Sequence, residues 1–307
     1  MDMEEPRSLF FPPEFVPAVS HPLVEDRGPE VRHRVLVHSL YQYLHFTTVL
    51  EQVAIVPVTA RISSNRSGVE APKAMLADAF KITTDEAWHA QFSYDFIEEV
   101  ERCSGVTATA MVEPNFVCLL DSIREVYTPG TGRALDLVAA TVSETLVSSL
   151  LSEIPNDARL PGPVRALVAD HAADEGRHHA YFRNFLRYLW PQLPKREQRT
   201  IGPRIPELVS AFLRPDLRAV AATLSASGFT QPETAEILGD CYPARSDAHG
   251  IRHAARSTVR SFREVGALDD LATNEAFLAA GLLAEPEASL GGCAADAGPP
   301  GSRRANG

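Results

Sequence analysis

Apolar residues recur at helical spacing along most of the chain. From residue 30 onward they fall three and four positions apart, and the first strong helix breaker in this stretch is Pro57. The alternation typical of β-strands is not found at any length. The pattern predicts an all-α fold, with helices over 30–60, 72–103, 114–127, 133–153 and 161–189, and shorter ones near 196–213, 215–225, 231–240, 246–266 and 268–283.

The segment 133–153 is apolar on nearly all sides, which is typical of a helix at the centre of a bundle. Glu144 lies in its middle and is the only acidic residue between Asp136 and Glu153. An uncompensated carboxylate in such surroundings costs several kcal/mol or stays protonated. Glu144 is therefore a candidate functional residue.

A run of chemistry-bearing residues stands out in the predicted helix 161–189. His171, Glu175 and His178 follow an H-x-x-x-E-x-x-H spacing. Since each helical residue turns about 100°, their side chains fall within roughly 60° of one another. One carboxylate between two imidazoles on a single stripe is a metal-binding arrangement if further carboxylates face it.

A second copy of this pattern supplies such carboxylates. Residues 85–89 (DEAWH) repeat the D-E-x-x-H order of residues 174–178, and each copy follows a lone Glu in an apolar stretch, Glu51 or Glu144. Four-helix bundles with two metals take one Glu from each of two helices and Glu-x-x-His from each of the other two. The sequence thus predicts a ferritin-like four-helix bundle core with additional C-terminal helices. A histidine-rich bundle without metal is the alternative.

Asp85 and Asp174 each precede the glutamate of an E-x-x-H copy. A metal-bound imidazole usually donates its other N–H to a carboxylate. Our hypothesis is that each Asp orients a histidine on the facing helix; the alternative is a solvated side chain with no role.

Composition and charge indicate which partners and which cellular compartment to expect for this chain. The net charge of −11 argues against nucleic acid, and no apolar run reaches the ~18 residues of a membrane span. The acidic N-terminus lacks the order of a signal peptide, and the four cysteines lack C-x-x-C spacing. We expect a cytoplasmic protein with free thiols and with neither nucleic acid nor membrane as a partner.

Three regions are expected along the chain. Residues 1–29 are rich in Pro and aromatic residues and predict an extended N-terminal arm. Residues 30–283 form a single helical domain that carries the metal pair, and residues 284–307, rich in Ala, Gly and Pro, are expected to be a disordered tail.

Carboxylate and imidazole ligands in this number suit iron or manganese better than tetrahedral zinc. We expect two iron ions, with a manganese–iron pair as the alternative. Four glutamates would neutralise two ferrous ions, which makes burial in a bundle core tolerable.

These residues, at these separations, resemble the diiron p-aminobenzoate N-oxygenase family. The ordinary ferritin-like pattern has two histidine ligands, and His171 adds a third, one turn before the second E-x-x-H. The likeness covers residues 30 to 190 and, more weakly, the helices up to about 270. It implies that Glu86 and Glu175 bridge two irons. It implies seven ligands in all: Glu51 and His89 completing one iron, and Glu144, His171 and His178 the other.

The resemblance also implies an activity. It is that of an O2-activating N-oxygenase which oxidises an amine, expected to be an aryl amine of secondary metabolism, to a hydroxylamine, nitroso or nitro product. It implies a homodimer and a separate electron donor, a ferredoxin or a reductase, because the chain shows no flavin or nicotinamide motif. The alternatives are hydroxylation or desaturation at carbon, and a non-catalytic ferritin-like iron-binding protein. A stored tyrosyl radical, as in a ribonucleotide-reductase small subunit, is disfavoured. The radical tyrosine would be expected four residues after His89, and Ser93 occupies that position. Pocket walls are expected from Val58, Phe92, Leu119, Val147 and Leu167.

Overall fold

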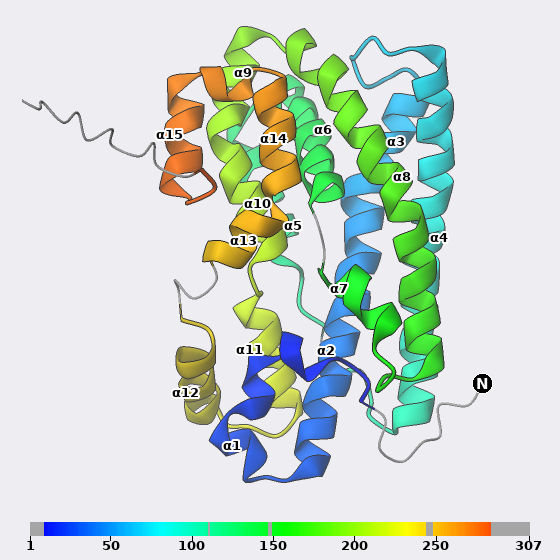
Figure 1. Ribbon diagram of the computed structural model, residues 1–307, viewed down its shortest axis with the longest axis vertical. Helices are drawn as coiled ribbons and strands as arrows, with labels where there is room; N and C mark the ends of the chain where they lie inside the picture. The colour runs from blue at the N-terminus through cyan, green and yellow to red at the C-terminus, as the bar shows by residue number, and fades with distance from the viewer. Residues whose placement is uncertain (1–8, 110, 147–148, 244–247, 284–307) are drawn as a thin grey trace, which may run out of the picture.

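The computed structural model describes residues 9–109, 111–146, 149–243 and 248–283. These residues form helices joined by short connections, and none of them lies in a strand (Figure 1). The all-α prediction is confirmed. No helix in this part of the chain is both long enough and apolar enough to cross a bilayer.

Four long elements make the core of the bundle. The first is a continuous helix made of α2 (Pro29–Leu50), the π-helical turn η3 (Glu51–Ile55) and α3 (Val56–Ser63). The other three are α4 (Lys73–Ser104), α6 (Pro129–Thr145) and α8 (Gly162–Gln192). Helix α4 packs along α2 and α3 and against α8, and α6 packs against α8 (Figure 1).

Local signals set the ends of these helices. Pro29 opens α2 directly after Gly28, whose φ is +83°. Helix α4 stops at Gly105 in the left-handed region, a conformation that glycine adopts without a Cβ penalty. Pro129 starts α6, and the Thr128 hydroxyl accepts a hydrogen bond from the N–H of Thr131.

The first predicted helix, 30–60, does not weaken at Pro57. It continues to Ser63, because Pro57 lies in the first turn of α3 just after the π-helical turn. There the Val56 N–H reaches back to the Glu51 carbonyl, five residues earlier. A proline ring is tolerated where the helical ladder is already interrupted.

The predicted helix 133–153 is not continuous. Helix α6 ends at Thr145, Leu146 is extended with ψ of 149°, and a separate short helix α7 spans Ser149–Glu153. The hydroxyls of Ser143 and Thr145 donate to carbonyls of the same helix in this final turn. Glu144 therefore lies at the end of α6 rather than in the middle of a longer helix.

The remaining helices cover the ends and sides of the bundle. Helices α9, α14 and α15 lie at one end near α6 and α8, whereas α11 and α12 lie at the other end near the N-terminal segment (Figure 1). Their bounds are α5 (Asn115–Val126), η4 (Ile154–Asn156), α9 (Lys195–Ile201), η5 (Gly202–Arg204), α10 (Ile205–Leu213), α11 (Leu217–Ala226), α12 (Gln231–Cys241), α13 (Ala248–Ala254), α14 (Arg256–Glu264), η6 (Ala267–Asp269) and α15 (Leu271–Ala279).

The N-terminal segment 1–29, predicted to be extended, contains short helices in its described part. These are η1 (Pro13–Phe15), η2 (Pro17–Ser20) and α1 (Pro22–Glu25), each opened by a proline, whose fixed φ also suits the first helical position. Phe10 and Phe11 are buried against the bundle. The predicted disordered tail, 284–307, lies outside the described residues.

Two hydrophobic clusters fill the interior, and the candidate site lies between them along the chain. On α8, Val168 belongs to one cluster and Phe182 to the other, with the H-x-x-x-E-x-x-H run in between. On α4, Ile82 and Ile97 flank the E-x-x-H copy in the same way. A band of polar groups thus separates two apolar layers of the bundle.

Candidate metal centre

All seven predicted site residues lie on the four core elements. Glu51 is the first residue of η3, Glu86 and His89 are on α4, Glu144 is in the last turn of α6, and His171, Glu175 and His178 are on α8. Six of them are buried, and Glu86, His89 and His178 are fully enclosed. The Glu175 side chain keeps 21% of its surface exposed.

Glu86 and Glu175 lie between the histidines. Glu86 Oε2 is 2.9 Å from His89 Nδ1, and its Oε1 is 2.7 Å from His178 Nδ1. Glu175 Oε1 is 2.9 Å from His171 Nε2 and 3.7 Å from His178 Nδ1. Each carboxylate of an E-x-x-H copy therefore contacts more than one imidazole.

The two glutamates outside the E-x-x-H copies, Glu51 and Glu144, each lie near a histidine of α8. Glu51 Oε1 lies 4.0 Å from His171 Nε2, and Glu144 Oε2 lies 4.0 Å from His178 Nδ1. The structure therefore brings each of the seven within 4.0 Å of another member of the set.

Two groups of donor atoms could each hold a cation. One comprises Glu86, His89, Glu175 and His178, the other Glu51, Glu86 and His171, with the donor atoms of each group within 4.8 Å of one another. Glu86 belongs to both, whereas Glu144 belongs to neither. The division implied by the resemblance differs here, since Glu51 groups with His171 and not with His89.

Two donor atoms of the centre, Glu51 Oε2 and Glu144 Oε2, are buried without a hydrogen bond. Glu86 Oε1 and His178 Nδ1 are also buried and lie 2.7 Å from each other. A buried polar atom without a partner is costly, so native proteins rarely keep several together. Cations coordinated by carboxylate oxygen and imidazole nitrogen would remove this cost, and the donor types suit iron or manganese. The residues present fit a pair of divalent metal ions.

Burial and neighbouring charges strongly shift the pKa values of the side chains in the centre. Burial raises the pKa of Glu51 and of Glu144 well above the ordinary value, and neighbouring carboxylates raise both further. Burial would also raise the pKa of Glu86, but contacts with His178 and His89 outweigh it and lower that pKa. The pKa of His178 rises to about 11, because Glu175 and Glu86 outweigh burial. Excess negative charge is thus balanced by bound protons, which cations would replace.

The predicted pairing of each aspartate with a histidine on the facing helix is confirmed. Asp174 Oδ2 on α8 lies 3.3 Å from His89 Nε2 on α4, and Asp85 Oδ2 on α4 lies 3.3 Å from His178 Nε2 on α8. The Nδ1 atoms of both rings remain turned toward the carboxylates of the centre.

Tyr43 was not identified from the sequence as a neighbour of the candidate centre. It precedes Thr47 and Glu51 at intervals of four residues, so the three share a stripe of the first helix. Burial raises the pKa of Tyr43, and the nearby charges of Glu175 and Glu51 raise it further. The i, i+4, i+8 spacing is the signal that would have found it.

The predicted pocket-wall residues take different positions. The Phe92 ring lies 5.4 Å from the His89 ring and 6.3 Å from that of His171. Val58 lines a pocket described below, Leu119 and Leu167 pack on the two hydrophobic clusters, and Val147 lies outside the described residues. Phe92 is therefore the wall candidate in contact with the centre.

The family model for p-aminobenzoate N-oxygenase AurF matches residues 2–266 of the chain. The chain belongs to this family. The family consists of amine-oxidising diiron enzymes, so the chain is a diiron N-oxygenase, and the predicted family, fold and enzyme class are confirmed. The match extends beyond the residues that carried the resemblance, through the N-terminal segment and the helices up to α14. A comparison with curated proteins found no match.

Proposed function

We propose that the chain oxidises the amino group of an aryl amine with O2, at two iron ions held by seven ligands: Glu51, Glu86, His89, Glu144, His171, Glu175 and His178. The observation that carries this proposal is the convergence of these side chains from four helices, where the buried oxygen atoms Glu51 Oε2 and Glu144 Oε2 lack hydrogen bonds. Glu86, which belongs to both donor groups, supports a bridging role.

The two ions would supply the electrons and the binding site for dioxygen. The chain's own residues do the rest of the work. Asp85 and Asp174 hold the Nε2 sides of His178 and His89, which fixes the direction of each Nδ1. Six of the seven proposed ligands are buried between two apolar layers, which limits the access of bulk water to the site.

An aryl amine is the substrate class that the family name supports, since it names p-aminobenzoate. Phe92 supports it independently, because its ring lies against two of the proposed histidine ligands and offers a flat apolar surface to an aromatic ring. The product, whether hydroxylamine, nitroso or nitro compound, stays a prediction.

The partners also belong to this proposal. A ferredoxin or reductase would deliver electrons, and the cytoplasm is the proposed compartment. A homodimer is supported by the outer side of α4, which exposes Phe80, Trp88 and Tyr94. Several large aromatic side chains exposed to solvent on one helix are typical of a protein–protein contact surface.

The experiment combines metal analysis with product identification. Protein produced with iron, with manganese and with both would be analysed for metal content, then given p-aminobenzoate or aniline, a chemical reductant and O2. We expect two metal ions per chain and N-oxidised products detected by mass spectrometry. Hydroxylation of the ring with the amine intact would instead favour the carbon-oxidation alternative. Metal uptake without any product would favour an iron-binding protein.

A further inference from the structure

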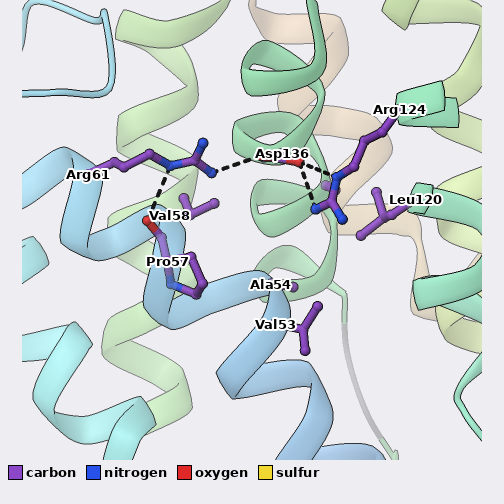
Figure 2. A pocket seen from close by; sticks show the side chains of 9 residues that line it. Val53, Ala54, Pro57, Val58, Arg61, Leu120, Arg124 and Asp136 are labelled. Atoms are coloured by element: carbon purple, nitrogen blue, oxygen red, sulfur yellow. Dashed lines mark hydrogen bonds and ion pairs between the residues drawn. The ribbon is translucent and has the colours of Figure 1, made fainter. Parts of the chain in front are cut away.

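A separate pocket of ≈ 330 Å³ opens between α3, α5 and α6 (Figure 2). Its inner wall is apolar and includes the buried residues Ala54, Val58, Leu120 and Ala139. Arg61 and Arg124 also line it, and Figure 2 shows both guanidinium groups directed to the carboxylate of Asp136. The volume is at the lower end of the range for small-molecule sites.

One carboxylate serves two guanidinium groups in this pocket. Arg61 Nη2 donates to Asp136 Oδ2 at 2.9 Å, and Arg124 donates to Oδ1 through Nε at 3.0 Å and Nη2 at 2.8 Å. Asp121 also accepts from Arg124, but its side chain is 61% exposed, so water screens its charge. The inner part of the pocket therefore carries more positive than negative charge.

The two arginines have donors to spare. Each guanidinium has five N–H groups. Arg61 makes two hydrogen bonds, to the Pro57 carbonyl and to Asp136, and its Nη1 faces no acceptor among the described residues. Arg124 makes three. Unused N–H groups beside an apolar wall suit a ligand with an anionic end and a hydrophobic body.

The pocket is distinct from the proposed metal centre. None of its lining residues is among the seven proposed ligands. Asp136 and Glu144 are eight residues apart on α6, a separation of about 12 Å along the helix axis. The pocket nevertheless touches the element that carries Glu51, because Val53 and Ala54 belong to the π-helical turn.

We propose that this pocket is a second binding site, for a small organic carboxylate with an apolar body. The carboxylate receives hydrogen bonds from Arg61 and Arg124, and the body lies against Ala54, Val58 and Ala139. A bound ligand would hold α3 against α6. Helix α3 follows the turn that contains Glu51, and α6 carries Glu144. The site does not depend on the proposed oxidation chemistry.

The test is calorimetric binding of benzoate to the metal-loaded full chain, with benzamide and inorganic phosphate as comparison ligands. We expect saturable benzoate binding, with benzamide and phosphate each weaker by about tenfold or more, since one lacks the charge and the other the apolar body. Arg61→Gln and Arg124→Gln should each weaken benzoate binding by a similar factor. Arg102→Gln, which removes a surface arginine paired with Glu99 on α4, should leave it unchanged.

Val53→Phe provides a second test that keeps both arginines. Val53 is partly exposed at the edge of the pocket, so a larger side chain there should obstruct entry without disturbing the core. If an arginine variant unfolds because its contact with Asp136 is lost, Val53→Phe still tests whether benzoate binds in this pocket. Absence of saturable benzoate binding, or equal affinity in Val53→Phe and the parent chain, would overturn the proposal whether or not the chain oxidises amines.

Discussion

His89 Nε2 on α4 lies 3.3 Å from Asp174 Oδ2 on α8, and His178 Nε2 on α8 lies 3.3 Å from Asp85 Oδ2 on α4. Each D-E-x-x-H copy thus supplies the aspartate that contacts the histidine of the other copy. The two copies are mutually dependent, although 85 residues separate His89 from Asp174 along the chain.

Replacing Asp174 by Asn should weaken metal binding and leave the fold intact. The amide retains the shape of the side chain but removes the charge that stabilises the His89 ring, and such changes typically cost 10–100-fold in metal affinity. Competition with a chelator would measure it. Asp95→Asn is the matched control on the surface of α4, where Asp95 accepts from Gln91. Equal affinity in Asp174→Asn and Asp95→Asn would contradict the orienting role.

Glu144→Gln should stabilise the metal-free protein and impair the metal-loaded one. Burial, with the charges of Glu175 and Glu86, raises the pKa of Glu144, so a neutral amide removes an unfavourable interaction. We expect a higher Tm after chelator treatment and less bound metal per chain. Glu153→Gln, at an exposed position of α7, should change neither quantity. A lower Tm in the metal-free variant would show that Glu144 has a structural partner instead.

Stability of the metal-free protein should fall as the pH rises from about 6.5 to 9. The pKa of His178 is raised to about 11, so its contribution is complete below its unfolded value of about 6.5 and is lost as the pH rises toward 11. Glu51 and Glu144, whose pKa values are also raised, act in the same direction. Metal affinity should increase over this range because the ligands must lose protons. Thermal unfolding at several pH values, with and without metal, measures both trends; a metal-free Tm that rises with pH would contradict them.

His171→Ala should lower metal content and turnover, whereas His179→Ala should leave metal content unchanged. His171 Nε2 faces Glu175 at 2.9 Å, while His179 Nε2 lies 3.0 Å from the Ser257 hydroxyl at the edge of the bundle. Elemental analysis and single-turnover assays of the two variants separate these positions. If both retained full metal content, His171 would not be a ligand.

The parts of the site that sequence predicts well are those fixed by a single helix. The stripe of His171, Glu175 and His178 follows from helical spacing alone, and the repeated D-E-x-x-H pattern indicates which helices face each other. Crossed contacts of Asp85 and Asp174 could be inferred because the pattern is symmetrical.

The parts that sequence did not reveal depend on how helices end and on distant contacts. Helix α6 ends at Thr145, directly after Glu144, and the apolar pattern of 133–153 contains no signal for that end. Glu51 groups with His171, and it opens a π-helical turn that helical spacing in the sequence does not predict. The contacts of Asp136 with Arg61 and Arg124 join three elements, and no local pattern connects them.

The π-helical turn that begins at Glu51 widens the backbone directly beneath one proposed ligand. Such turns contain one surplus residue and are frequent at functional sites. Glu86 and Glu175 stand on regular helices. Glu51 is thus the proposed ligand whose backbone departs from regular α-helical geometry.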